Sequence, residues 1–94
     1  EIDTGISGEA ARQVGMVMKE LSLDHQIISI THQAQIAAKA DTHFFVYKEL
    51  QADKIVTSVK ILDQEERILN IATMLSGQKP TAAAFQNAKE MITE

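Results

Sequence analysis

Two titratable side chains, Glu1 and His32, occupy positions in this 94-residue sequence from which they could act together on a phosphate group. Glu1 precedes a short polar turn at residues 3–8 that leads into a predicted helix, and His32 follows the apolar run 27–30. Ligands of open α/β sheets bind beyond the carboxyl ends of the strands. A carboxylate and an imidazole at the ends of neighbouring parallel strands would therefore face one crevice, and together they would form half of a phosphate-handling site.

Each of these residues also has an explanation that involves no chemistry. A lone glutamate at the start of a sequence carries no information, and a lone histidine beside a strand end is more often a hydrogen-bonded structural residue. His25 and His43 are isolated, without paired carboxylates at ligand spacing, whereas protein metal sites use clustered ligands. The sequence therefore predicts no metal site.

The elements that would position Glu1 and His32 follow from capping residues and hydrophobic periodicity. Ser7 can cap a helix and Glu9 suits its positive first turn. Apolar residues at three- and four-residue steps continue this helix to near Leu23: Ala10, Ala11, Val14, Val17, Met18 and Leu21. Residues 26–31 are β-branched and apolar on both faces, which is typical of a buried central strand. A helix of one or two turns is expected at 33–40.

A hairpin and two closing helices are predicted for the second half. Strands at 43–48 and 54–62 are joined by a polar link at 49–53. Asp63 and Glu66 form a capping-box pair that starts a helix ended by Gly77, with Ile68, Leu69, Ala72 and Leu75 facing inward. The last helix, 82–93, presents Ala84, Phe85, Ala88, Met91 and Ile92 on one face. The predicted fold class is α/β, with a parallel core strand, an antiparallel hairpin and flanking helices.

The composition restricts the classes of function. The formal net charge is -4, and the nine Lys and Arg residues are scattered, so this segment alone has no basic patch for duplex DNA. The absence of cysteine excludes disulfides, thiol catalysis and cysteine-based zinc sites. No apolar run approaches the roughly 20 residues that span a bilayer. We therefore expect a cytoplasmic domain without a membrane partner.

Several stretches carry a family resemblance: residues 1–8, 28–37, 40–49 and 87–90. Together they resemble the C-terminal part of the RecN family, the SMC-like, ABC-type ATPases of bacterial DNA double-strand-break repair and recombination. The resemblance covers nearly the whole chain. It implies one partial domain, 1–94, which is the C-terminal lobe of an ATPase head that starts at the end of the Walker B motif, in a cytoplasmic, nucleoid-associated protein. The abrupt start without Met fits a piece of a longer chain.

The resemblance implies a role for each candidate residue. Glu1 corresponds to the acid after the Walker B aspartate, which orients and polarises the water that attacks the γ-phosphate. His32 corresponds to the switch histidine, which contacts that phosphate. The D-loop, which packs across two heads closed on ATP, corresponds to Asp3, Thr4, Gly5, Ser7 and Gly8. Many relatives have aspartate where this chain has Ser7, which cannot supply the carboxylate of that aspartate, and a helix cap explains Ser7 equally well.

The implied cofactors are ATP and Mg²⁺ in the complete protein. The sequence lacks Gly-x-x-x-x-Gly-Lys-Ser/Thr, so the phosphate cradle is expected in the preceding part of the protein. Residues 75–78, Leu-Ser-Gly-Gln, are similar to an ABC signature, but they follow the switch histidine and end a predicted helix. We therefore expect the segment alone to bind no cofactor tightly and to hydrolyse no ATP. The implied partners are the N-terminal lobe of the same head, a second head in a homodimer, and DNA in the full-length assembly.

Two other interpretations stay open at this point. The chain could be a free-standing α/β interaction module in which Glu1 and His32 are incidental, or the head of another SMC-like repair ATPase. Four or more aliphatic residues ending in Asp directly before Glu1 would favour an ATPase, and a polar linker would exclude it. Upstream coiled-coil arms of modest length would favour RecN. If an upstream lobe is missing, apolar surface should be exposed on the core strand and the first helix.

Overall fold

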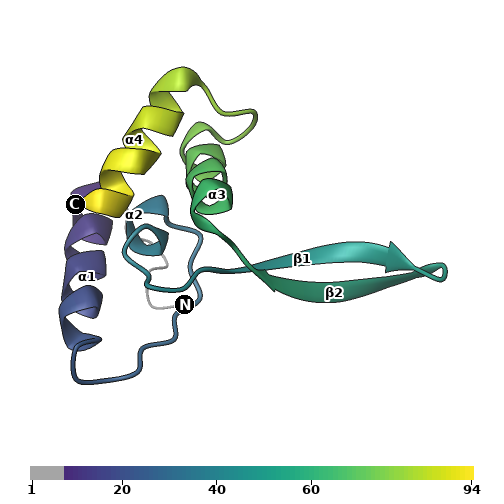
Figure 1. The fold of residues 1–94 in the computed structure, drawn as a ribbon, viewed down its shortest axis with the longest axis horizontal. Helices are drawn as coiled ribbons and strands as arrows, with labels where there is room; N and C mark the ends of the chain where they lie inside the picture. The colour runs from purple at the N-terminus through teal and green to yellow at the C-terminus, as the bar shows by residue number, and fades with distance from the viewer. Residues whose placement is uncertain (1–7) are drawn as a thin grey trace.

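The computed structural model describes residues 8–94, which form helices packed together and one projecting hairpin (Figure 1). The elements in chain order are α1 Gly8–Leu21, α2 Ala34–Ala37, β1 Phe44–Gln51, β2 Lys54–Ile61, α3 Gln64–Ser76 and α4 Ala82–Thr93. Figure 1 shows α2 between α1 and the pair formed by α3 and α4, with the hairpin extending away from all of them. The predicted mixture of helices and an antiparallel hairpin is confirmed.

Local capping chemistry sets the ends of α3 and the start of α4. The Asp63 carboxylate accepts a hydrogen bond from the Glu66 amide at 2.8 Å, and the Glu66 carboxylate accepts one from the Asp63 amide at 3.0 Å. This capping box satisfies two amides that a helix start leaves unpaired. Gly77, with φ of 76°, ends α3 in the left-handed conformation. Thr81 caps α4 by accepting from the Ala84 amide at 3.1 Å.

The core lies between α2, α3 and α4 and consists mostly of small side chains. Ile71 and Ala72 of α3 and Ala88 of α4 are fully buried. The other members of this cluster are Ala34, Ala37, Ala38, Ala84 and Met91, with Ile68, Met74, Leu75, Phe85 and Ile92 packed at its edge. The predicted inward faces of α3 and α4 are confirmed apart from Leu69, which is 47% exposed. Leu69 faces the open angle between α3 and the hairpin, where it lines a shallow groove with Phe45 and Tyr47.

The hairpin is a continuous antiparallel ladder whose register runs from Phe44 opposite Ile61 to Gln51 opposite Lys54. A two-residue turn joins the strands, and both of its residues, Ala52 and Asp53, have positive φ. Positive φ at both central residues is characteristic of a type I′ turn. The twist of this turn matches that of the paired strands. The predicted hairpin is confirmed, but the predicted link at 49–53 is too long, since residues 49–51 continue the ladder.

The base of the hairpin is joined to the start of α3. The Leu62 amide donates to the His43 carbonyl at 2.9 Å, and the Leu62 side chain is buried. The Lys60 ammonium donates to the Glu66 carboxylate at 2.6 Å, which lowers the pKa of Glu66 and raises that of Lys60. Because both groups are exposed to solvent, this ion pair orients the two elements more than it stabilises them.

The predicted buried core strand at 26–31 is absent from the described part of the chain, residues 8–94. Residues 26–33 have no regular secondary structure, and Ile28 and Ile30 are 85% and 73% exposed. A strand obtains its backbone hydrogen bonds from neighbouring strands, but both strands in residues 8–94 pair with each other. The β-branched residues favour a strand, but the described residues 8–94 contain no further strand with which this segment could pair.

Helix α1 also leaves much of its apolar stripe uncovered. The helix ends at Leu21, slightly before the predicted Leu23, and its buried residues are Ala11 and Gly15. Val17 and Leu21, predicted to face inward, are 54% and 48% exposed because the four-residue α2 covers only a small part of α1. The expectation of exposed apolar surface on α1 and on residues 26–31 is therefore confirmed.

Gly15 allows α1 and α2 to approach closely. A Cβ atom at this position would lie 3.0 Å from the Gln35 carbonyl oxygen and 3.2 Å from the Lys39 side chain. We expect Gly15→Val to lower the free energy of unfolding by about 1 to 3 kcal/mol, because the backbone of α2 must move. Met16→Val is a matched control, since Met16 is exposed in the same helix. Urea denaturation followed by circular dichroism measures both, and equal midpoints for the two variants would contradict this contact.

Candidate functional site

The structure describes two of the predicted site residues, Gly8 and His32. Glu1 and the D-loop positions Asp3, Thr4, Gly5 and Ser7 lie outside the described residues, so the convergence of Glu1 and His32 stays a prediction. Gly8 opens α1 with φ of 58°, a conformation that favours glycine because other residues are strained there. His32 is exposed and lies two residues before Ala34, the first residue of α2.

His32 is held between a local turn and a short helix. On the turn side, the Gln33 amide donates to the Thr31 hydroxyl oxygen at 2.9 Å. Gln33 is the N-cap of α2, and its carbonyl accepts from the Ala37 amide at 3.0 Å. The backbone that carries His32 is therefore joined directly to the start of α2.

Arg67 of α3 binds the C-terminal end of α2. Its Nη2 donates to the Ala37 and Ala38 carbonyls at 3.3 and 3.2 Å, and the residue is only 8% exposed. These carbonyls lie at the C-terminal end of α2, which carries partial negative charge, and the Ala37 carbonyl also accepts from the Ala40 amide at 3.2 Å. Burial lowers the pKa of Arg67, and the negative charge of Asp41 partly opposes that shift. Arginine nevertheless stays protonated in proteins, so a buried cation supports α2.

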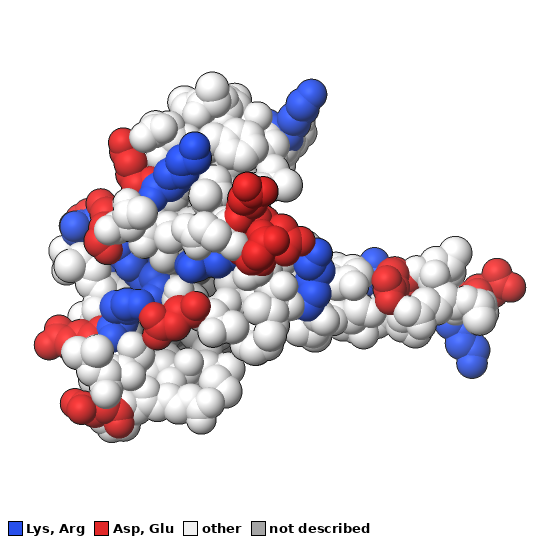
Figure 2. All heavy atoms as spheres, in the orientation of Figure 1, with Lys and Arg blue, Asp and Glu red and all other residues white. Residues whose placement is uncertain are grey.

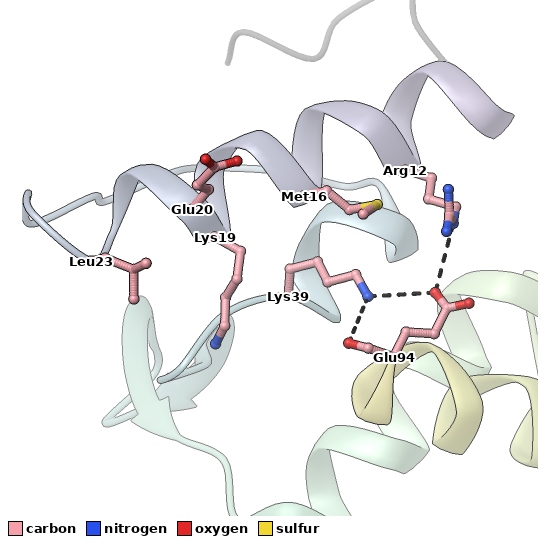
Figure 3. A pocket seen from close by; sticks show the side chains of 7 residues that line it. All are labelled: Arg12, Met16, Lys19, Glu20, Leu23, Lys39 and Glu94. Carbon is pink, nitrogen blue, oxygen red and sulfur yellow. Dashed lines mark hydrogen bonds and ion pairs between the residues drawn. The ribbon is translucent and has the colours of Figure 1, made fainter.

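Lys39 connects the residues that follow α2 to α4. Its ammonium donates to the Met91 carbonyl at 3.2 Å and to the Glu94 carboxylate at 3.4 Å. The Lys39 side chain is 8% exposed. Figure 3 shows the side chains of Lys39 and Arg12 converging on Glu94. The Lys39 contacts join the residues after α2 to α4, while Arg67 joins the C-terminal end of α2 to α3.

The pocket in Figure 3 is a hollow of about 380 Å³ lined by Arg12, Met16, Lys19, Glu20, Leu23, Lys39 and Glu94. Its three cations are already paired. Arg12 lies 3.1 Å from Glu9 and 3.8 Å from Glu94, Lys39 pairs with Glu94, and Lys19 pairs with Asp41. A phosphate ligand would compete with carboxylates for each of these cations. The hollow is therefore best explained as a structural junction.

Charges of both signs alternate over the helical part on the face drawn in Figure 2. This face shows no continuous basic stripe of the kind that binds a phosphate backbone. Within residues 8–94, no group of three or more His, Cys, Asp or Glu side chains could hold a metal ion. None of the helices in this described part is long and apolar enough to cross a membrane.

His43 lies near Arg67 and differs from His32 in its surroundings. Its Nδ1 is buried without a hydrogen-bond partner. Burial, and next the positive charge of Arg67, lowers the pKa of His43, so the neutral form is favoured at pH 7. The sequence interpretation assigned no function to His43 or to Arg67. One signal was present for Arg67, since it lies four residues before Ile71 and so on the inward face of α3.

The signature-like stretch at 75–78 is a helix end, as predicted. Helix α3 stops at Ser76, and Gly77 supplies the left-handed cap. Anions bind at helix N-termini, where amides point outward, and a helix C-terminus presents carbonyls instead. These residues therefore do not form a phosphate site.

The chain is similar to proteins named DNA repair protein RecN. It is 36% identical over 94 residues to the protein of Bacillus subtilis, 45% over 92 residues to that of Rickettsia typhi and 38% over 92 residues to that of Vibrio cholerae. These matches cover 98 to 100% of this chain but 16 to 17% of each relative, in their C-terminal part. No family model matches the chain.

Proposed function

We propose that this chain, which is homologous to the C-terminal part of the RecN DNA repair proteins, is the C-terminal lobe of an ATPase head that acts in DNA double-strand-break repair and recombination. The observation that carries the proposal is 36 to 45% identity extending over 98 to 100% of the chain. Because the chain spans only 16 to 17% of these relatives, the other parts of the head come from the rest of the protein.

In this proposal Glu1 orients and polarises the attacking water, and His32 donates a hydrogen bond to the γ-phosphate. The D-loop, residues 3–8, packs against a second head in a homodimer. Phosphoryl transfer depends mainly on positioning and charge stabilisation, which a carboxylate and an imidazole can supply. The exposed position of His32 before α2, and its support by that helix, are compatible with a phosphate contact.

The uncovered apolar surface supports a lobe that packs against the N-terminal lobe of the same head. Ile28 and Ile30 are more than two-thirds exposed, which is unfavourable in a free-standing module. In the complete head we expect residues 26–31 to become the parallel strand that their pattern predicts. ATP and Mg²⁺ would be held largely by the preceding part of the protein, where Mg²⁺ neutralises phosphate charge. DNA binding belongs to the full-length assembly in the cytoplasm.

A structure of the complete head with Mg²⁺ and a non-hydrolysable ATP analogue tests the proposal. We expect the Glu1 carboxylate within one water of the γ-phosphate and the His32 imidazole within roughly 2.6 to 3.2 Å of one of its oxygens. Residues 26–31 should pair with strands from the preceding part of the protein. If Glu1 and His32 lie on opposite sides of the head, the proposal is wrong and the interaction-module interpretation is favoured.

A further inference from the structure

We infer that Arg67 is a positioning residue that fixes α2, and through α2 the switch histidine His32, against the C-terminal helices. The inference rests on the proposed function, because it gives Arg67 a part in the reaction that His32 serves. Its basis is geometric, since one guanidinium nitrogen donates to the two consecutive carbonyls of Ala37 and Ala38 at the end of the helix that follows His32.

Burial makes Arg67 unlike an ordinary arginine on a helix. The residue is 8% exposed, and its Nε is buried without a hydrogen-bond partner. A buried cation costs free energy that pairing and hydrogen bonds must offset. Its hydrogen bonds go to backbone carbonyls, while Asp41 interacts with it only through space. An apolar residue would fill this space without that cost, so the hydrogen bonds to α2 are the specific contribution of arginine.

The shortness of α2 makes its position dependent on these contacts. A helix of four residues has almost no stability of its own, because nucleation is unfavourable. Contacts with three other helices hold α2 in place. Gly15 allows α1 to pack closely against it, and Arg67 of α3 binds its C-terminal end. Lys39, which follows α2, reaches the Met91 carbonyl of α4. Since His32 lies two residues before the first residue of α2, a shift of this helix displaces the imidazole.

The test compares variants in the complete protein. Arg67→Met keeps a long side chain but removes every donor, and we expect kcat for ATP hydrolysis to fall roughly 10- to 100-fold through misplacement of His32. Arg67→Lys keeps a charged donor and should restore part of the loss. The control is Thr81→Ala, which removes the α4 cap and lowers stability without touching α2. Its turnover should match the unaltered protein at a temperature where all variants remain folded by circular dichroism.

Two further readouts separate positioning from general structural support. Amides of residues 33–38 should exchange hydrogen faster in Arg67→Met than in Thr81→Ala. The double variant with His32→Ala should be no slower than His32→Ala alone, because Arg67 acts through His32. Additive losses, or normal turnover of Arg67→Met while His32→Ala is slow, would overturn this inference and leave the proposed function intact. Normal turnover of His32→Ala would overturn the role of His32 and this inference with it.

Discussion

Glu1→Gln in the complete protein is expected to abolish nearly all ATP hydrolysis while ATP binding and head closure remain. The substitution keeps the size and the hydrogen-bonding capacity of the side chain but removes the negative charge. A glutamine cannot polarise the attacking water, and loss of a general base typically slows a reaction by about 10²- to 10⁴-fold. Because nothing in the proposed role of Glu1 contributes to nucleotide affinity, the effect should fall on kcat.

Phosphate release at saturating ATP measures kcat, and binding of a fluorescent ATP analogue measures the nucleotide affinity separately. Glu9→Gln is the matched control, because it makes the same substitution on an exposed turn of α1, where Glu9 pairs with Arg12. Its turnover should be normal. Closed heads should accumulate with ATP in the Glu1 variant, which size-exclusion chromatography can detect. Unchanged turnover of Glu1→Gln would remove Glu1 from the mechanism.

The elements that the sequence predicted correctly are those specified by neighbouring residues. The capping box of Asp63 and Glu66 and the left-handed Gly77 each involve residues at most a few positions apart. The hairpin is similar, because a two-residue turn sets the register of both strands. Such features need no information about the rest of the fold, and they appear in this chain even with much of its apolar surface uncovered.

The missed features depend on partners distant in the sequence. Residues 26–31 have the composition of a central strand, but the hydrogen-bonding neighbours that such a strand needs are absent from residues 8–94. Leu69 has the period of an inward residue, yet it faces the angle beside the hairpin. Arg67 was missed for a related reason. Its charge indicates a surface position, and only the carbonyls of α2, about thirty residues away, explain its burial.

The predicted site was located only in part for the same reason. The short helix predicted after His32 is confirmed, whereas the strand that His32 was predicted to end is absent from the described residues. The distance between Glu1 and His32 stays a prediction, because Glu1 lies outside the described residues. Family resemblance supplied the roles that spacing alone left undecided, and the roles of the individual residues stay predictions.

His32→Ala is expected to lower kcat for ATP hydrolysis by about 10²-fold, because removal of one donor from a developing phosphate charge typically costs this much or more. His32→Gln retains a donor and should recover part of the rate. His25→Ala is the matched control, since His25 is exposed and its ring Nδ1 lies 3.3 Å from the Leu21 carbonyl at the end of α1. Its rate should be normal.

The distribution of the His32→Ala effect between kcat and KM distinguishes its two possible roles. A switch histidine that senses the γ-phosphate acts mainly in the transition state, so KM for ATP should change much less than kcat. A histidine that only completes the turn before α2 would, when removed, loosen residues 33–38 and leave kcat near normal. Stopped-flow binding and single-turnover hydrolysis resolve these steps. A normal single-turnover rate together with faster hydrogen exchange in α2 would return His32 to a structural role and leave the phosphate contact without a residue in this chain.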